Sequence, residues 1–228
     1  MPTDVLFTWS SGKDSALALA RLLRSPEHRV TGLLTTVTEG YDRVSMHGVR
    51  RQLLEQQAER LGLPLSLVTI PQQADNDIYE TRMRAELLRH REAGVTTVAF
   101  GDIFLADLRR YREEKLASVE LEAVFPLWQQ DTTALADELI SQGYEVTITC
   151  VDSQAFADTG KSAEAFAGRR FDRQFLADLP ASVDPCGENG EFHTFVSAAP
   201  IFRASISVTV GGKLLRDERF WFCDVVPS

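Results

Sequence analysis

A polar loop joins a strand-like segment to a helix-like segment at the start of the chain, and this junction limits the possible folds more than any other feature. The apolar run Val5–Trp9 leads into the loop W-S-S-G-K-D-S, and a helical pattern follows through Arg24. A helix N-terminus carries partial positive charge and unpaired N–H donors, so the junction favours binding of a phosphate or pyrophosphate group. The alternative is a helix that Ser10 or Ser11 caps without any ligand.

The loop does not have the Walker A pattern. That motif needs glycine at position 7 and Ser or Thr at position 14, where this chain has Phe7 and Asp14. The loop instead resembles the S-G-G-x-D-S loop of the ATP pyrophosphatases, or PP-loop enzymes, which cleave ATP between its α- and β-phosphates. Ser11 is the one departure, because that family usually has glycine there. If residue 11 needs a positive φ, the backbone strain of serine there lowers the stability of the folded protein by on the order of 1 kcal/mol.

Strand and helix patterns alternate through residues 1–128, which we expect to form an ATP-binding domain. Near-continuous apolar strands that alternate with amphipathic helices predict an α/β fold with a doubly wound parallel sheet. The expected strands are Val5–Trp9, Arg29–Val37, Leu65–Ile70 and Thr96–Phe100, and the expected helices are Asp14–Arg24, Val49–Leu61, Asp77–Glu92 and Arg109–Leu116.

Ligands of such sheets bind beyond the carboxyl ends of the strands, and several polar residues fall at those ends. Thr35 and Thr36 close the second strand, His47 precedes the second helix, and Gly101-Asp102 follows the fourth strand. We expect the first three and Gly101 to contact ATP, and Asp102 to bind Mg²⁺ or to position an acceptor. The alternatives are a local cap for His47 and an N-cap or turn for Asp102.

The pattern changes after Trp128, and we expect a smaller α+β part over residues 129–228 that binds the substrate. In order, the patterns predict a helix over Asp131–Gln142, a strand over Glu145–Val151, irregular or short helical structure over Asp152–Asp178 and a loop over Leu179–Glu191. From His193 onward, apolar and polar residues alternate around Gly211-Gly212. This pattern predicts an antiparallel hairpin whose turn is the Gly-Gly pair.

The predicted loop ends in a second segment that packing does not explain, D-P-C-G-E-N-G-E-F-H-T-F over residues 184–195. Its glycines let the backbone approach a ligand closely, and loops of this kind carry function more often than they fill a core. Its carboxylates are suited to hold Mg²⁺, to orient an amine or to act as a general base.

Residues 186–195 match C-G-E-x-G-E-[FY]-H-T-F, a pattern of the diphthine–ammonia ligase family, which the chain resembles over nearly its whole length. The PP-loop, Gly101-Asp102-Ile103, the R-x-R-x-E pattern at Arg110, Arg112 and Glu114, and Pro126-Leu127-Trp128 resemble that family in the same order. The resemblance implies a HUP-like, adenine nucleotide alpha hydrolase-like fold. It also implies an amidation in which a carboxylate attacks the α-phosphate of ATP, pyrophosphate leaves, and ammonia or an amine displaces AMP from the acyl-adenylate.

In the eukaryotic and archaeal pathway of that family, the carboxylate belongs to diphthine on translation elongation factor two. If this chain is bacterial, that substrate is absent; the sequence does not name the acceptor, which is an unknown protein or small-molecule carboxylate. The expected cofactors are ATP and Mg²⁺.

The site residues divide by expected role. By the chemistry of the loop, Ser10, Ser11, Gly12, Lys13 and Ser15 are predicted to hold the β- and γ-phosphates, and Asp14 either contacts the metal or stabilises the first helical turn. Lys13, Asp102, Glu188 and Glu191 are the predicted catalytic residues, Asp14 and Asp102 the predicted Mg²⁺ ligands, and Cys186, Gly187, Asn189 and His193 the predicted substrate contacts. Cys186 has no C-x-x-C partner, which favours a structural thiol.

Arg110, Arg112 and Glu114 are predicted substrate contacts on the resemblance alone. Arginine binds oxyanions in a bidentate manner, which fits an acceptor clamp. Their charge pattern by itself favours a solvated ion-pair face of a helix.

Net charge and cysteine usage exclude several classes of protein. The chain carries a net charge of −9, which argues against broad nucleic-acid binding. Its three dispersed cysteines favour a reducing cytoplasm, and no apolar stretch predicts a membrane helix or signal peptide. No histidine pair has zinc-ligand spacing.

The aromatic segment Phe220-Trp221-Phe222 fits either the hydrophobic core or the interface of a homodimer.

Three other functions remain open from the sequence. A PP-loop tRNA-modifying enzyme would want paired cysteines and a basic surface. An ATP-binding sensor of the same fold would not need the segment 186–195. A hydrolase of adenine nucleotides would use water as the acceptor.

Overall fold

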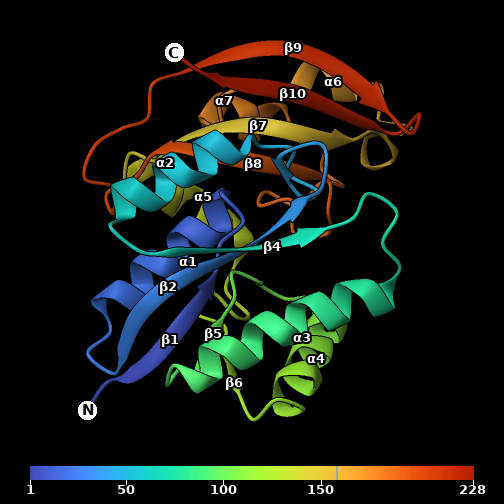
Figure 1. Ribbon diagram of the computed structural model, residues 1–228. Helices are drawn as coiled ribbons and strands as arrows, with labels where there is room; N and C mark the ends of the chain where they lie inside the picture. Colours follow the sequence, from blue (N-terminus) through green and yellow to red (C-terminus); the bar gives the residue numbers. More distant parts are fainter. Residues whose placement is uncertain (158) are drawn as a thin grey trace.

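In a computed structural model, which describes residues 1–157 and 159–228, the apolar segments of the N-terminal half form a mostly parallel sheet (Figure 1). The parallel strands lie in the order β4-β2-β1-β5-β6, and the short β3 pairs antiparallel with the end of β2. The strands are β1 Thr3–Thr8, β2 His28–Thr38, β3 Arg43–Val44, β4 Leu65–Ile70, β5 Thr97–Ala99 and β6 Glu122–Val124. The sequence predicts β1, β2, β4 and β5, whereas β3 and β6, of two and three residues, are missed.

Helices cover both faces of this sheet, as predicted for a doubly wound α/β fold. On one face lie α1 Lys13–Arg24 and α2 Arg51–Leu61, and on the other lie α3 Asn76–Glu92 and α4 Ala106–Ala117. Val5 and Phe7 of β1 enter the core that contains α1 and α2, while Leu6 enters the core that contains residues of α3 and α4. A strand buried on both faces therefore reads as a continuous apolar run.

The strand order leaves a crevice between the carboxyl ends of β1 and β5. The chain runs from β1 through α1 to β2 on one side, whereas β5 pairs with β1 on the other side. Ligands of open α/β sheets bind at such a reversal of strand order. The polar loop follows β1 and Gly101-Asp102 follows β5, so both segments meet at this crevice.

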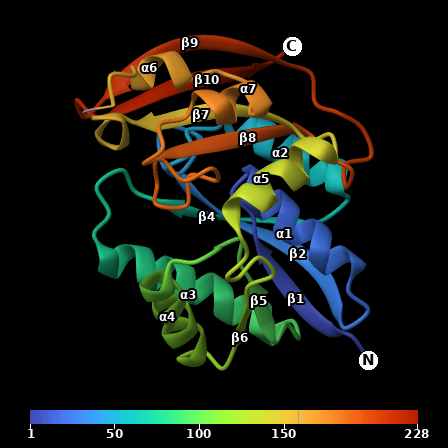
Figure 2. The same ribbon diagram turned by 180° about the vertical axis from the view of Figure 1, so that it is seen from behind.

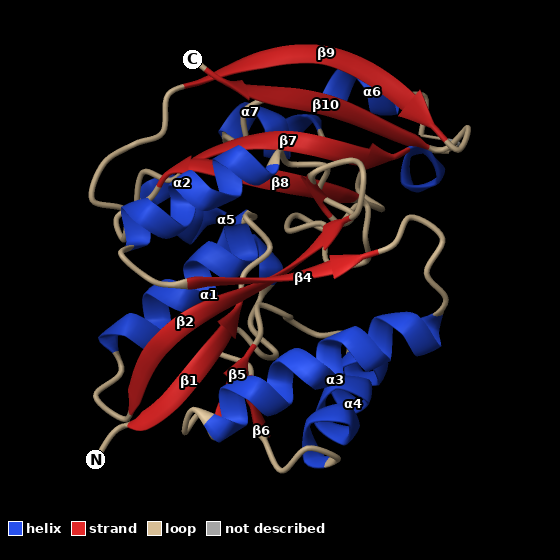
Figure 3. Ribbon diagram, viewed as in Figure 1, coloured by secondary structure: helices blue, strands red, loops and turns tan. Residues whose placement is uncertain are grey.

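The C-terminal part forms a second, antiparallel sheet in the order β8-β7-β10-β9 (Figure 3). Its elements are α5 Thr132–Ser141, β7 Glu145–Asp152, the 3₁₀ helix η1 Ser153–Phe156, α6 Ala163–Phe166, α7 Arg173–Asp178, β8 Phe192–Ala198, β9 Val208–Arg216 and β10 Phe220–Pro227. Viewed from behind, α5 and α1 lie between the two sheets (Figure 2). One hydrophobic core joins Leu19 and Leu53 to Ile148 and Phe195, so the second sheet packs firmly against the first part.

The predicted hairpin exists, but its predicted turn is wrong. The chain reverses at Asp217 and Glu218, which have φ values of 52° and 52°. Gly211 and Gly212 lie inside β9, where the register shifts opposite Asp224. Two residues facing one are the mark of a β-bulge, a place where glycine is common. The Gly-Gly pair therefore bends a strand, while two residues without a glycine signal make the turn.

Other elements agree with the sequence apart from their ends. The helix predicted from Arg109 begins at Ala106, and the segment Asp152–Asp178 contains η1, α6 and α7. Residue 158 of that segment lies outside the described residues. Within the described part of the chain, none of the helices combines the length and the apolar character needed to cross a membrane.

Candidate functional site

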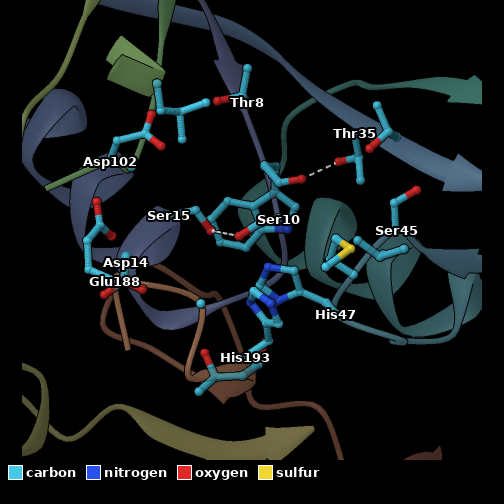
Figure 4. A pocket seen from close by; sticks show the side chains of 18 of the residues that line it. Thr8, Ser10, Asp14, Ser15, Thr35, Ser45, His47, Asp102, Glu188 and His193 are labelled. Atoms are coloured by element: carbon cyan, nitrogen blue, oxygen red, sulfur yellow. Dashed lines mark hydrogen bonds between the residues drawn. The ribbon is translucent and has the colours of Figure 1, made fainter. Parts of the chain in front are cut away.

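A cleft of about 510 Å³ lies at the crevice, between the strand ends of the first sheet and the loop that precedes β8 (Figure 4). The predicted residues that line it are Ser10, Asp14, Ser15, Thr35, Thr36, His47, Gly101, Asp102, Arg112, Gly187, Glu188, Asn189 and His193. The topology thus brings most of both sequence motifs to one cavity. Tyr79, Met83 and Thr194 also line it and were missed, because their residue types carry no chemical signal on their own.

The polar loop presents hydrogen-bond donors to this cleft. Among the described residues, no acceptor is recorded for the backbone N–H groups of Asp14 and Ser15, at the N-terminus of α1. The Ser10 hydroxyl donates to Ser15 Oγ at 3.0 Å, and the Ser15 hydroxyl donates to the Gly12 carbonyl at 2.9 Å. Free N–H groups at a helix N-terminus are suited to bind an anion.

Ser11 adopts the positive φ that the family usually assigns to glycine. Its φ is 71°, in the left-handed region, and its side chain is fully buried. Within the described residues, its Oγ has no hydrogen-bond partner. Both the backbone conformation and the unpaired hydroxyl cost free energy at this position.

The side chain of Lys13 is buried and is not among the residues that line the cleft. Its Nζ lies 2.8 Å from Asp14 Oδ2, donates to the Cys186 carbonyl, and stands over the Phe192 ring at 5.2 Å from the centroid. Burial acts to lower the pKa of Lys13, but Asp14 and the other acidic groups nearby outweigh it and raise that pKa above its ordinary value. The lysine is therefore a buried cation that ties the polar loop to the C-terminal loop. Its predicted contact with phosphate stays a prediction.

Strand β8 is hydrogen-bonded directly to the polar loop. The Lys13 N–H donates to Thr194 Oγ1 at 3.0 Å, and the Val196 N–H donates to the Ser11 carbonyl at 3.0 Å. The buried amide of Gln57 donates to the carbonyls of Ser11 and Val196. The two sequence motifs, far apart in the chain, therefore form one hydrogen-bonded unit.

Two glycines permit this close packing. A Cβ on Gly12 would lie 2.9 Å from His47 Cε1, and a Cβ on Gly101 would lie 3.0 Å from the Ser15 backbone nitrogen. Any side chain at either position would force the neighbouring segments apart. Gly12 thus brings His47 against the polar loop, and Gly101 brings the end of β5 against α1.

Two carboxylates organise the loop that precedes β8. Asp184 Oδ1 accepts the N–H groups of Cys186 and Glu188, and Glu191 Oε1 and Oε2 accept the N–H groups of Asp184 and Asn189. Glu191 is buried outside the cleft lining, although the sequence predicts it among the catalytic residues. The Cys186 thiol is also buried outside the lining, and burial raises its pKa, which favours a neutral, structural thiol.

Glu188 is the acidic residue that the loop turns toward the cleft. Its Oε1 accepts the N–H groups of Ile103 at 2.7 Å and Phe104 at 3.3 Å, so the loop is fastened to the segment after β5. Burial, together with the negative charges of Asp14 and Asp102, raises the pKa of Glu188 to about 7. A carboxyl group that titrates near neutral pH is suited to general acid–base work.

Asp102 forms an ion pair with Arg112 at the edge of the cleft. Asp102 Oδ2 lies 2.9 Å from Arg112 Nε, and the guanidinium stands over the Phe100 ring at 4.3 Å from its centroid. Burial raises the pKa of Asp102, although Arg112 acts in the opposite direction. The pair therefore leaves Arg112 oriented by both charge and stacking.

Two histidines lie together on another wall of the cleft (Figure 4). The ring centroids of His47 and His193 are 4.7 Å apart, and His47 Nδ1 lies 3.1 Å from the Thr194 carbonyl. Because a carbonyl only accepts, Nδ1 carries the proton and Nε2 is left with a lone pair. Burial, with a smaller contribution from the charges of His47 and Lys13, lowers the pKa of His193 to about 3.

The Thr35 hydroxyl donates to the Trp9 carbonyl at 2.6 Å.

The carboxylates of the cleft do not form a complete metal cage. No group of three or more His, Cys, Asp or Glu residues within the described ranges has the arrangement to hold an ion. Asp14 and Asp102 line the cleft and are each paired with a cation. Mg²⁺ commonly takes only one or two protein carboxylates and completes its shell with phosphate oxygens and water, so this donor set suits an ion that arrives with a nucleotide.

Comparison with known families decides what kind of chain this is. A family model described as the N-terminal domain of diphthamide synthase matches residues 3–120, and one described as its C-terminal domain matches residues 131–226. The chain belongs to the diphthamide synthase family. This confirms the family predicted from residues 186–195 and the PP-loop, and with it the prediction of an enzyme.

Several relatives of this chain carry the name diphthine–ammonia ligase. The protein from Danio rerio is 28% identical over 218 residues, which are 87% of this chain and 84% of the relative. The protein from Rattus norvegicus is 25% identical over 225 residues, 87% of this chain and 80% of the relative. The protein from Schizosaccharomyces pombe is 27% identical over 226 residues, 90% of this chain but 36% of that longer relative.

The R-x-R-x-E pattern of the diphthamide synthase family reaches the cleft at one position in this chain. Arg112 lines the cavity, whereas Arg110 and Glu114 are exposed on α4 outside the lining. Arg110 Nη2 lies 3.5 Å from Asp107 Oδ1 on the surface. Helical periodicity explains the split, because residues two apart point in different directions.

Proposed function

We propose that the chain is an ATP-dependent ligase that joins an amine nitrogen, from ammonia or an amine donor, to a carboxylate through an acyl-adenylate. The observation that carries the proposal is the meeting of the two motifs at one cleft. Asp14 and Ser15, whose N–H groups are unpaired within the described residues, line this cleft together with Glu188. The names of the relatives support the ligase class, and the acceptor is left as an unknown carboxylate.

In the first half-reaction the acceptor carboxylate attacks the α-phosphorus of ATP, and pyrophosphate leaves. The N–H groups of Asp14 and Ser15 bind the phosphate oxygens and stabilise the charge that develops on the departing pyrophosphate, and the Ser10 hydroxyl can join them by turning from Ser15 Oγ. Thr36, near the end of β2, accepts the N–H of Ser45, and both residues line the cleft. Their backbone groups are suited to contact the adenine ring. His47 closes that wall with its Nε2 lone pair facing away from the Thr194 carbonyl.

In the second half-reaction ammonia attacks the acyl carbon, AMP leaves and one proton is released. Glu188 is the residue suited to accept that proton, because its pKa of about 7 keeps both protonation states populated at neutral pH. Its two backbone hydrogen bonds fix the position of the carboxyl group. Arg112 is placed to hold the acceptor carboxylate, since a guanidinium binds oxyanions in a bidentate manner.

Mg²⁺ is a proposed second component of the reaction. Asp14 and Asp102 are the residues that would hold it beside the phosphates, and it would neutralise charge on the polyphosphate. In this scheme residues 1–128 bind the nucleotide, and residues 129–228 supply the loop with Glu188 and the β8 side chains of the substrate side.

A product analysis with α-labelled ATP tests the proposal. The purified protein is incubated with Mg²⁺, labelled ATP, ammonium and a carboxylate-rich cell extract, and the nucleotides are resolved. We expect AMP and pyrophosphate, with Glu188→Gln losing most of this activity. Glu122→Gln is the matched control, because Glu122 is exposed on β6 outside the cleft.

The other products have equally clear meanings. ATP that binds but stays intact with every extract would contradict the ligase and support an ATP-binding sensor. ADP with phosphate would contradict cleavage between the α- and β-phosphates. AMP formed at the same rate without any acceptor would point to hydrolysis by water.

A further inference from the structure

A second cavity, of about 580 Å³, lies between α3 and α4 beside the cleft. Its floor includes Phe100 after β5, and its walls include Leu87 of α3, Leu116 of α4 and Val119 just after α4. The volume falls in the range of small-molecule sites, which are about 300–1,000 Å³. Neither the polar loop at residues 10–15 nor the loop that precedes β8 reaches this cavity.

The cavity exists because α3 and α4 are bridged at their rims and bury little against each other. Leu87 is the buried residue of α3, and Leu116 is the buried residue of α4. Lys115 Nζ lies 2.6 Å from Glu80 Oε2, and the Tyr111 hydroxyl lies 3.2 Å from Glu80 Oε1. These polar contacts join the two helices at the rim, above an apolar floor.

The second cavity adjoins the cleft through a shared wall. Tyr79, Met83 and Arg112 line both cavities. The two cavities therefore meet at these three side chains, and Asp102 and Glu188 line the cleft. This adjacency makes the second cavity a candidate subsite of the reaction centre.

The shared arginine sets the chemistry of the ligand. A guanidinium has five N–H donors, and Asp102 Oδ1 accepts one of them, from Nη2 at 3.1 Å, while Nε, 2.9 Å from Asp102 Oδ2, has no hydrogen-bond partner among the described residues. The remaining donors of Arg112 are oriented by its stacking on Phe100. Of the three cations that line the cavity, Arg112 is paired with Asp102 and Lys115 with Glu80, whereas Arg84 lies in no ion pair within the described residues. An anion with an apolar body matches this lining.

We infer that the acceptor is a small organic acid whose apolar or aromatic body occupies the cavity between α3 and α4, with its carboxylate at Arg112. This inference rests on the proposed ligase function and adds the class of substrate. One carboxylate oxygen would form the bond to the α-phosphorus of ATP as the bond to pyrophosphate breaks. Ammonia would then form the C–N bond, AMP would leave with that oxygen, and the proton would pass to Glu188.

A simple acid serves as the probe of the cavity. We would titrate 4-phenylbutyrate, and its neutral amide 4-phenylbutyramide, into ¹⁵N-labelled protein that holds a non-hydrolysable ATP analogue. We expect the acid to shift amide resonances of α3 and α4 and to bind at least about tenfold more tightly than the amide. Arg112→Gln should abolish the preference for the acid. No shift in α3 or α4 at about 10 mM acid, or equal binding of acid and amide, would overturn the inference.

A cavity-filling variant tests the same subsite with the natural acceptor in a cell extract. Thr81 is exposed on α3 and lines only the second cavity, so Thr81→Trp should block it. Ala85 is exposed on the same helix and lines neither cavity, so Ala85→Trp is the matched control. We expect Thr81→Trp to bind ATP normally and to lose at least about tenfold of the extract-dependent AMP formation, while Ala85→Trp keeps both.

The outcomes separate the two proposals. Extract-dependent AMP formation that Thr81→Trp leaves unchanged would overturn the subsite while the ligase function stands. A wild-type protein that forms no AMP with any extract would overturn the ligase function, and the inference with it, whatever the probe does. Normal ATP binding by Thr81→Trp serves as the measure that this variant is folded.

Discussion

The two loops that face each other across the cleft differ in whether their backbone N–H groups already have acceptors. The polar loop at residues 10–15 leaves the N–H groups of Asp14 and Ser15 open, so it offers donors. The loop at residues 184–191 gives its N–H groups to its own carboxylates, Asp184 and Glu191, and then presents Glu188. One loop is suited to bind an anion and the other to hold a titratable acid in place.

This difference shows how one cleft can hold both a polyphosphate and a group near neutral pKa. An open set of donors favours the charged form of a ligand, whereas a crowded acidic wall favours the protonated form of its own carboxyl group. The two loops are still mechanically linked, because Lys13 reaches from one to the other. Substitution of Lys13 breaks that link, and substitutions at Glu191, Glu188 and Ser11 each change one loop alone.

The largest effect is expected for Lys13→Met, which removes the cation shared by both loops. The substitution leaves Asp14 without its partner and the Cys186 carbonyl without its donor. We expect a loss of about 3 kcal/mol in the free energy of unfolding, as for other broken buried pairs. Urea denaturation measures it. Lys161→Met is the control, because Lys161 also donates to a carbonyl, that of Asp178, but is exposed.

The next effect is expected for Glu191→Gln in the C-terminal loop. Glu191 accepts three hydrogen bonds, two from backbone N–H groups and one from the Asn189 amide. A glutamine replaces one accepting oxygen with a donor that faces another donor, which should cost about 2 kcal/mol. Glu59→Gln is a control, since that side chain is 71% exposed. Equal urea midpoints for the two variants would contradict the loop-organising role of Glu191.

The sequence predicted the first part of the fold well because burial on two faces leaves a continuous apolar pattern. It placed the hairpin in the second sheet but misplaced its turn. Strand pairing fixed the turn at Asp217 and Glu218, while the Gly-Gly pair formed a bulge. Local turn preference was overridden by the register of β10 against β7 and β9.

At the site, the sequence indicated which residues meet but not which way each side chain points. Glu188 and Glu191 carry the same group three residues apart, yet one faces the cleft and the other is buried behind the loop. Gln57 and Thr194 connect the two motifs through hydrogen bonds that no pattern reveals, because the contacts join distant parts of the chain. Orientation depends on these tertiary contacts.

A pH effect should separate the acidic wall from the rest of the cleft. Because the folded pKa of Glu188, about 7, lies above the ordinary 4.5, its contribution to stability is fully present below pH 4.5 and is lost as the pH rises through 7. Glu188→Gln has no such loss. We expect the stability of the variant, relative to wild type, to rise by about 2 kcal/mol between pH 4.5 and pH 7.5, a value reduced for solvent screening.

Urea denaturation at several pH values, without nucleotide and with EDTA present, measures this difference. The comparison at pH 4.5 is the internal reference, since Glu188 is then largely protonated in the folded protein. A stability difference that stays constant over the whole range would show that burial and the charges of Asp14 and Asp102 do not raise the pKa of Glu188.

The smallest effect is expected for Ser11→Gly in the polar loop. Ser11 has a φ of 71° and a buried, unpartnered hydroxyl within the described residues. Glycine removes the strain and the hydroxyl, and it adds backbone freedom to the unfolded chain that offsets part of the gain. We expect a net stabilisation of about 1 kcal/mol, measured by urea denaturation.

Ser11→Ala divides that gain into its two causes. Alanine keeps the strained φ but lacks the hydroxyl, so it should recover only the part that comes from the unpaired oxygen. If alanine stabilises as much as glycine, the hydroxyl is the whole cause and the backbone is relaxed. If glycine alone stabilises, the polar loop holds a strained residue between Gln57, which bonds its carbonyl, and the open N–H groups of α1. The strain would then belong to the loop that offers donors and not to the loop that has used them.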